Sequence, residues 1–189
     1  MANSNAPRGL RPVRHVGGGK IRLSDHYSIA SAYGTAIYQG DPVQMTGTAK
    51  NIELSAATNV DNIGVFWGVS YVDASGNQVF SKYWPASTTA TDIKAYVYDD
   101  PNIEFEVQAD TATSGVVGRL IDWAAGTGSA TTGQSGAYAN STTTATTGAA
   151  LRIMGLVERP DNAYGQYAKI RVMFAEHVLG RVIAGVGGI

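Results

Sequence analysis

The sequence predicts an all-β domain with many loops, and three observations lead to this prediction. Short apolar segments are separated by clusters of Gly, Pro, Asn and Asp, which is typical of strands joined by turns. Only 15% of the residues are charged, whereas about 25% are charged in most soluble domains. Glycine is abundant, with 23 among 189 residues. A chain of this length forms one domain and is large enough to bury a core.

The composition argues against several kinds of protein. The chain has no Cys, so disulfides, thiolate metal sites and thiol catalysis are excluded. No apolar run approaches the ~20 residues of a membrane-spanning helix, and the polar first twenty residues do not resemble a secretory signal. The net charge of -1 argues against a body that binds nucleic acid.

Residues 1–24 form a segment of uneven charge. It has no acid and carries five bases, which are Arg8, Arg11, Arg14, Lys20 and Arg22. Pro7 and Pro12 are incompatible with a regular helix or a central strand, and residues 17–19 are all Gly. This segment cannot bury enough apolar surface to fold alone. We therefore expect an extended basic arm that is disordered or laid along a partner.

Residues 35–80 predict a series of short strands. Residues 35–47 fit two strands around a tight corner at 40–42, and residues 63–72 are apolar enough for a strand that is covered on both faces. Residues 73–78 have the composition of a hairpin turn. We expect the segment that follows this turn to pair back onto residues 63–72.

Residues 93–110 give the clearest strand pattern of the chain. Ile103, Phe105 and Val107 alternate with polar residues, which is the period of a half-buried strand. The sequence Asp-Asp-Pro at residues 99–101 separates this strand from the one before it. We expect the two strands to form a hairpin.

The second half of the chain contains a stretch of low complexity. Residues 111–122 leave room for one turn of helix. Of the 27 residues in 124–150, 24 are Gly, Ala, Ser or Thr, so this insertion is either a flexible loop or contains Thr-rich strands such as 141–147. Two further strands, 151–157 and 167–174, complete a β domain that spans residues 25–180. Residues 181–189 form an apolar tail.

No catalytic or metal-binding set emerges from the sequence. His15, His26 and His177 lack the spacing of a metal site, so they are interpreted as exposed or hydrogen-bonded structural residues. Glu104 and Glu106 lie side by side on one strand face, whereas a glycosidase needs two carboxylates that converge on a cleft. A solvated face that opposes edge pairing is the favoured interpretation. We therefore predict no enzymatic activity, no cofactor and no metal.

The three tryptophans are candidate core or binding residues. Trp67 lies inside a hydrophobic segment and is expected in the core. Trp84 precedes a proline and Trp123 precedes the low-complexity stretch, so both are candidates for anchors of an interface.

Three blocks of the chain resemble the head cement, or decoration, proteins of tailed bacteriophages, which are encoded beside the major capsid protein. The blocks are MANSNAPRGLRPVRH, YVYDDPNIEFEVQAD and LRIMGLVERPDNAYGQYAKIRVMFAEH. The resemblance implies a single β-barrel or a jelly-roll-like sandwich. The residues themselves add the extended N-terminal arm and the long Gly/Ser/Thr/Ala-rich loop, and this loop is not part of the resemblance. The resemblance also implies a place on the exterior of the capsid in the virion, after synthesis in the host cytoplasm.

On this interpretation, the protein clamps neighbouring major capsid subunits and stabilises the mature head. Arg8, Arg11 and Arg14 are expected to pair with capsid carboxylates, with the arm as the main tether. Trp84 and Trp123 are the other expected interface residues. Low charge and apolar ends favour a homo-trimer or homo-dimer at a capsid symmetry axis. No membrane partner is expected.

Other interpretations stay open. A glycan-binding or adhesion module displayed on the virion surface would stack an exposed Trp84 or Trp123 on sugar rings. A glycosidase would use Glu104 and its acidic neighbours. Binding of nucleic acid would rely on the arginines of the arm to hold phosphates, and the acidic run argues against it for the body.

Overall fold

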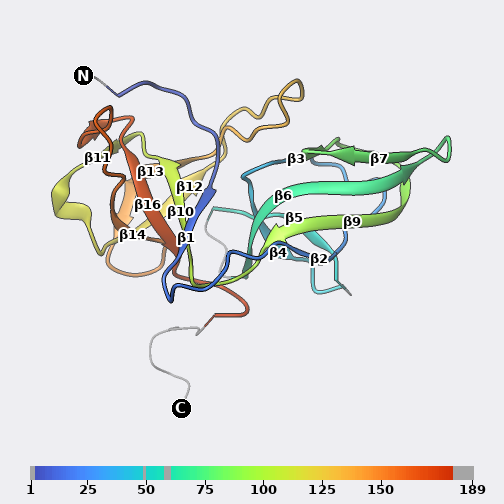
Figure 1. The fold of residues 1–189 in the computed structure, drawn as a ribbon, viewed down its shortest axis with the longest axis horizontal. Helices are drawn as coiled ribbons and strands as arrows, with labels where there is room; N and C mark the ends of the chain where they lie inside the picture. The colour runs from blue at the N-terminus through green and yellow to red at the C-terminus, as the bar shows by residue number, and fades with distance from the viewer. Residues whose placement is uncertain (1–2, 49, 58–60, 181–189) are drawn as a thin grey trace, which may run out of the picture.

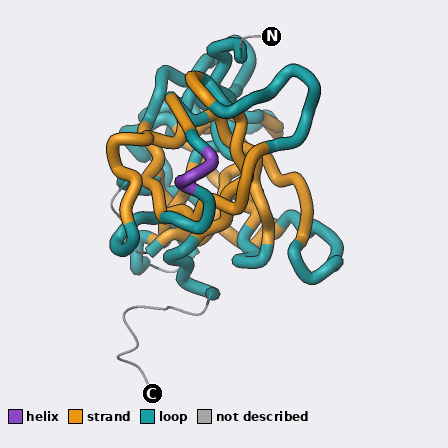
Figure 2. The backbone as a smooth tube through the Cα atoms, turned by 90° about the vertical axis from the view of Figure 1, so that its left-hand side faces the viewer, coloured by secondary structure: helices purple, strands orange, loops and turns teal. Residues whose placement is uncertain are grey.

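The computed structural model describes residues 3–48, 50–57 and 61–180, and these residues are organised almost entirely as β-strands (Figure 1). The single helical element among them is the short 3-10 turn η1 (Ser114–Val116), visible in Figure 2. This element occupies the place where one turn of helix was expected. The all-β prediction is confirmed. The strands form two main sheets that lie next to each other along the long axis of the molecule (Figure 1).

The first sheet has the strand order β1-β10-β16-β14-β12-β13, and all its pairs are antiparallel. Its strands are β1 (Arg11–His15), β10 (Ile103–Gln108), β12 (Leu120–Ala124), β13 (Tyr138–Ala145), β14 (Leu151–Leu156) and β16 (Lys169–Phe174). The sheet curls until Ala139 of β13 forms a bridge with Ala109, just after β10. The strands do not close into a ring, so the fold is an open, sandwich-like arrangement and the barrel alternative is wrong.

The second sheet has the order β2-β9-β6-β4-β5, and one further strand, β7, pairs with the second half of β6. Its strands are β2 (Ser24–Tyr27), β4 (Pro42–Met45), β5 (Ile52–Leu54), β6 (Asn62–Asp73), β7 (Gln78–Ser81) and β9 (Ala90–Tyr98). Two short pairs complete the structure, β3 (Ile37–Tyr38) with β8 (Tyr83–Trp84) and β11 (Thr111–Ala112) with β15 (Gly165–Gln166).

The local predictions for residues 35–80 are confirmed. β3 and β4 flank the corner at residues 40–42, and β6 is buried along most of its twelve residues. The turn between β6 and β7 is held by Asp73, whose Oδ1 accepts hydrogen bonds from the backbone N–H groups of Ser75 and Asn77, both at 2.9 Å. These contacts stay within a few residues, which is why composition alone predicts the turn.

The predicted hairpin of residues 93–110 is wrong. β9 belongs to the second sheet and β10 to the first, so the segment between them carries the chain from one sheet to the other. The Asp-Asp-Pro sequence marks the end of a strand, but the partners of each strand come from distant segments: β9 lies between β2 and β6, and β10 lies between β1 and β16. Ile103, Phe105 and Val107 are all buried, as expected, but Glu104 and Gln108 on the other face are only 1% and 6% exposed. The expected half-buried strand with a solvated acidic face is therefore wrong, because β1 and β16 cover β10 on both edges and Arg14 and Arg171 bind Glu104.

The N-terminal arm is extended, as expected, but it lies along its own chain. β1 forms an edge of the first sheet by pairing with β10, and β2 pairs with β9 of the second sheet. Leu10 is fully buried in the core of the first sheet. The expectation of an arm that is disordered or laid along a partner is therefore wrong for its described residues, because β10 offers it an edge that the composition of residues 1–24 cannot reveal.

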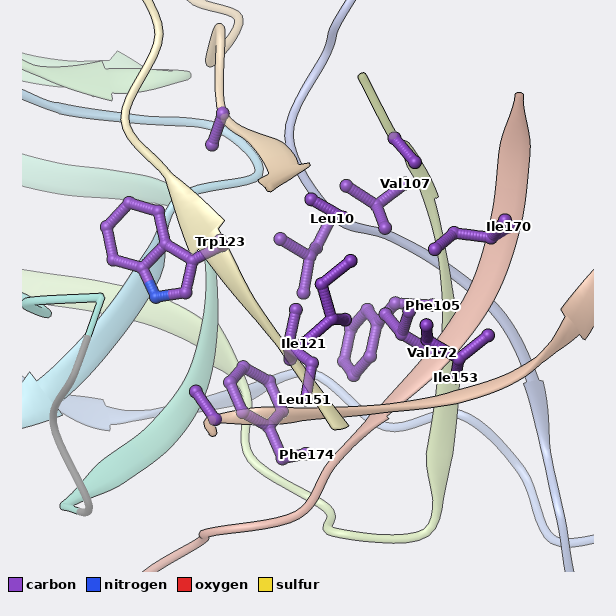
Figure 3. Close-up of a cluster of buried hydrophobic side chains, with 14 of the residues drawn as sticks. Leu10, Phe105, Val107, Ile121, Trp123, Leu151, Ile153, Ile170, Val172 and Phe174 are labelled. Atoms are coloured by element: carbon purple, nitrogen blue, oxygen red, sulfur yellow. The ribbon is translucent and has the colours of Figure 1, made fainter. Parts of the chain in front are cut away.

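Each sheet has a hydrophobic core of its own. The core of the first sheet includes Leu10, Phe105, Ile121, Trp123, Leu151, Ile170 and Phe174. In Figure 3, Leu10, Phe105, Ile121 and Leu151 lie together at the centre of this core, and the ring of Trp123 lies to one side of them. The core of the second sheet includes Ile37, Phe66, Val69, Trp84 and Val97. Val65 of β6 packs in the first core, so the longest strand of the second sheet also contributes to the other half of the molecule.

The low-complexity stretch 124–150 contains both a loop and a strand. Its second half includes β13, and its first half crosses to Gln39, between β3 and β4 of the second half of the molecule. Gln39 N–H donates to the carbonyl of Gly133 at 2.9 Å, and Ser135 N–H donates to the carbonyl of Gln39 at 3.0 Å. The loop therefore joins the two sheets. The predicted tail of residues 181–189 lies outside the described residues.

Candidate functional site

The N-terminal arm passes between the two sheets at Gly9 and Leu10. Leu10 N–H donates a hydrogen bond to the carbonyl of Gly40 at 2.8 Å. Gly9 has a φ of 67°, and a Cβ atom there would lie 2.5 Å from the oxygen of Gly40, so only glycine fits this turn. Burial of Leu10 leaves the flanking side chains of Arg8 and Arg11 exposed.

Arg8 and Arg11 line two pockets together with residues from distant parts of the chain. One pocket has a volume of about 290 Å³ and is lined by Arg8, Arg11, Gln39, Trp67, Lys82 and Gln134. The other, of about 280 Å³, brings in the charged residues Glu106, Arg159, Asp161 and Lys169. We call the five cations Arg8, Arg11, Lys82, Arg159 and Lys169 the basic surface. Among the described residues that line the two pockets, the acids are Glu106 and Asp161.

Most cations of the basic surface are free to bind a partner. Arg8, Arg11, Lys82 and Lys169 have no ion pair with any described residue. Arg159, in contrast, binds both oxygens of Glu106, at 2.9 and 3.3 Å, and lies 3.7 Å from Asp161. Both carboxylates thus have Arg159 as a partner, and the five cations still outnumber them, so the excess positive charge suits a partner with carboxylates or other anionic groups.

Arg14, the third arm arginine of the prediction, is occupied within the chain. Its Nε and Nη2 atoms each donate to Glu104 at 2.8 Å, and Nη1 of Arg171 donates to the same carboxylate at 3.4 Å. Hydrogen bonding and charge from Glu104 raise the pKa of Arg14 above its ordinary value. Since Glu104 is only 1% exposed, this cluster neutralises a buried charge. The structure therefore groups Arg8 with Arg11 and separates Arg14 from them.

The acids before β10 are also held by the fold. Asp99 accepts a hydrogen bond from Ser24 Oγ at 2.7 Å, and Asp100 contacts His15 Nε2 at 3.1 Å. Burial raises the pKa of Asp100, but hydrogen bonds from Asn102 and the nearby His15 outweigh burial, so its pKa lies below the ordinary value. These contacts fasten the arm to the crossover between the two sheets.

The predicted roles of the tryptophans need correction. Trp84 is 0% exposed in the second core, where it packs edge-on against Tyr71, and Trp123 is 2% exposed in the first core. Neither ring reaches the surface, so neither anchors an interface or stacks on a sugar. Trp67 was expected in the core, but it is half-buried beside Tyr98 and lines the pocket of Arg8 and Arg11.

The histidines occupy three different environments. His15 Nδ1 accepts hydrogen bonds from two backbone N–H groups of the glycine turn, and His26 is largely exposed. His177 is buried, and this burial lowers its pKa to about 4, although Asp99 and Asp100 act in the opposite direction.

Within the described ranges, no group of three or more His, Cys, Asp or Glu residues is placed to hold a metal ion. Nor do these ranges contain a helix with the length and apolar character needed to cross a membrane.

No protein-family model, curated protein or solved structure matches this chain. The fold and the basic surface are therefore the features that point to a function. Sequence reasoning identified Arg8 and Arg11 from the charge of the arm, but it missed Lys82, Arg159 and Lys169. These residues come from segments that are far apart along the chain, and no local pattern distinguishes them from other surface cations.

Proposed function

We propose that this protein is a structural component of a phage virion that binds the outer surface of the capsid and stabilises the mature head by bridging neighbouring major capsid subunits. The observation that carries this proposal is the basic surface, where Arg8 and Arg11 are exposed, unpaired and attached to a segment that is fixed in the fold. The resemblance of the three sequence blocks to head cement proteins supplies the partner.

The geometry of the arm supports binding by preorganisation. Gly9 and Leu10 hold the backbone between the two arginines, so partner binding does not have to order a free segment. A guanidinium group presents a planar fork that binds both oxygens of a carboxylate, which a lysine cannot do. Each contact is modest, but many copies on a closed lattice, each bridging two subunits, resist expansion together. Self-association into a trimer or dimer at a symmetry axis is part of this proposal.

The first test is co-sedimentation of the purified protein with shells assembled from the major capsid protein that the resemblance implies as its partner. We expect saturable binding at a fixed ratio to the capsid subunit, weakening at high salt because the contacts are ionic, together with a higher temperature of shell disruption. Absence of binding would overturn the proposal. Binding without a higher temperature of shell disruption would show that the protein decorates the capsid but does not stabilise it, and this would overturn the cement part of the proposal.

The second test assigns the binding to the basic surface. In the double variant Arg8→Glu/Arg11→Glu, we expect binding to shells to fall by at least about a hundredfold, since two ion pairs are replaced by repulsion. The matched control is Lys20→Glu/Arg22→Glu, which makes the same change of charge at exposed arm residues outside the basic surface. Equal loss in both variants would show a dependence on net charge alone. Deletion of residues 1–19 is not a suitable test, because it removes Leu10 and β1 from the fold.

A further inference from the structure

A third pocket lies on the opposite side of the N-terminal arm. The extended backbone of residues 4–8 alternates: Ser4, Ala6 and Arg8 face the basic surface, whereas Asn5 and Pro7 line a separate pocket of about 440 Å³. The other side chains that line it include Gln108, Asp110, Thr127, Tyr138 and Tyr167. We propose that this pocket binds a neutral saccharide of one or two units. This proposal does not depend on capsid binding.

Two tyrosines give the pocket its apolar faces. Tyr138 begins β13 and Tyr167 lies just before β16, and both rings are half-buried. Neither hydroxyl group hydrogen-bonds to another described residue, so both are available to a ligand. A pyranose ring has apolar C–H faces and a polar rim, which match a tyrosine ring and its hydroxyl group. The volume lies within the usual range of about 300–1,000 Å³ for small-molecule sites.

The polar groups of the pocket are oriented before any ligand arrives. Oδ1 of Asp110 accepts hydrogen bonds from the backbone N–H groups of Thr111, at 2.7 Å, and Ser141, at 2.8 Å, and no described residue donates to Oδ2. Oδ1 of Asn5 accepts from Nε2 of Gln108 at 2.8 Å, which leaves the Nδ2 amide group as a free donor. The pocket thus offers one fixed acceptor and one fixed donor.

This mixture of groups favours a sugar over an ion. Each sugar hydroxyl both donates and accepts a hydrogen bond, so it uses a fixed acceptor and a fixed donor together. The carboxylate of Asp110 repels anions, and the described lining residues include no cation. A cationic ligand would find the single carboxylate and the tyrosine rings but would leave the Asn5 donor unused. The test below therefore includes a cation as a competing probe.

The backbone also shapes the pocket. Gly126 and Gly136 lie on two crossing segments, and a Cβ atom at Gly126 would collide with the carbonyl oxygen of Gly136, so no side chain fits there. Tyr167 has a φ of 57°, in the left-handed region that is unfavourable for a non-glycine residue. Its N–H donates to the carbonyl of Asp110 at 3.0 Å. A strained residue that places a ring in a pocket is consistent with a binding role.

The proposal is tested by titration of the full-length, isotope-labelled protein with methyl glucoside, methyl galactoside, N-acetylglucosamine and maltose, with amide chemical shifts as the readout. We expect saturable shifts of the amides of Thr127, Tyr138 and Tyr167 for at least one sugar, with a dissociation constant of about 1 mM, equivalent to about −4 kcal/mol. Shifts with tetramethylammonium but with none of the sugars would overturn the proposal, as would no saturable shift with any probe up to about 50 mM, some fifty times the expected constant.

Three variants place the binding in this pocket. Tyr167→Gly removes one ring at a position whose φ suits glycine, and Asp110→Asn replaces a carboxylate oxygen by a donor, so each is expected to weaken binding about tenfold. Tyr164→Ala is the matched control, because this tyrosine is 41% exposed and lies outside the pocket. Should Tyr167→Gly fail to fold, Tyr167→Asn replaces it, since asparagine tolerates the same φ. Sugar binding that stays unchanged in the pocket variants would overturn the assignment.

Discussion

Ser135 Oγ donates a hydrogen bond to Oδ1 of Asp41 in the interior of the protein, where the two residues are 3% and 7% exposed. Asp41 begins the corner into β4, and Ser135 belongs to the loop that crosses from the first sheet. Oδ2 of the same carboxylate accepts the N–H of Tyr38 at 2.7 Å. One buried side chain therefore ties the loop, β3 and β4 together.

The variant Ser135→Ala is expected to lower the free energy of unfolding by about 2 kcal/mol, because it leaves a buried carboxylate short of one donor. The loss should be larger at neutral pH than near pH 4. Burial raises the pKa of Asp41, and the bonds from Ser135 and Tyr38 lower it, so removal of one bond raises this pKa further. A raised carboxyl pKa in the folded state makes stability fall as pH rises through that pKa.

Urea denaturation at pH 4 and pH 7 measures both effects. Ser75→Ala is the control, because Ser75 is exposed in the β6–β7 turn and its hydroxyl bonds to no described residue; its cost should stay within about 0.5 kcal/mol. A Ser135→Ala protein as stable as the control would contradict the role given to this hydrogen bond.

His177 predicts a loss of stability in acid. Burial lowers its pKa from 6.5 to about 4, so between these values the unfolded chain binds the proton and the folded chain does not. The stability it contributes is complete above pH 6.5 and declines as pH falls toward 4, by about 3 kcal/mol in all. His177→Gln should flatten this decline in urea denaturation between pH 7 and pH 4, while His26→Gln, at an exposed histidine, should leave it unchanged. An equal decline in both variants would show that other groups cause it.

Glu104→Gln tests whether the acidic strand is structural. The change replaces the carboxylate that accepts from Arg14 and Arg171 by a neutral amide, and we expect a loss of about 2 kcal/mol. Glu158→Gln is the control, since Glu158 is exposed and has no described partner. Thermal and urea unfolding provide the comparison. A stability equal to that of the control would reopen a functional role for Glu104.

Gly9→Ala should displace the arm. The new Cβ would stand 2.5 Å from the carbonyl oxygen of Gly40, at a positive φ, so we expect a cost of at least about 2 kcal/mol. Gly18→Ala has a similar φ of 72° with no atom within 4 Å, and it should cost only about 1 kcal/mol. Amide hydrogen exchange of β1 distinguishes the two variants, because release of the arm exposes the β1–β10 hydrogen bonds in Gly9→Ala only. Equal protection of β1 in both variants would contradict the inference that Gly9 is needed to hold the arm against Gly40.

The sequence predicted what neighbouring residues decide and missed what distant residues decide. The turn at Asp73 and the burial of Ile103, Phe105 and Val107 were predictable, because their causes lie within a few residues. The burial of Glu104 was not, because it depends on Arg14 and Arg171 from distant strands. The partner of β10 was not, because β1 and β16 come from opposite ends of the chain. Trp84 was wrongly predicted to anchor an interface because it precedes Pro85. Its burial depends on packing in the second core and against the ring of Tyr71, which a neighbouring proline does not reveal.

The candidate site could also be predicted only where its features depend on residues that are close together in the sequence. The charge of the arm pointed to Arg8 and Arg11, but nothing local distinguished them from Arg14. The difference depends on which side chains lie opposite on β10: Glu104 is buried and binds Arg14, whereas Glu106 is already held by Arg159. Exposed cations are therefore identified by their neighbours in space, which the sequence does not show.

The two sheets draw their strands from the chain in different ways. All strands of the second sheet come from one continuous stretch, β2 to β9, whereas the first sheet combines β1 with strands that follow β9. During synthesis, the second sheet can therefore form while the rest of the chain is still being made. β1 has no partner until β10 emerges, so its pairing is a late event that closes a long loop. The segment that carries Arg8 and Arg11 thus reaches its final place only after most of the protein has been made. The basic surface therefore forms late in folding, and incompletely folded molecules lack it.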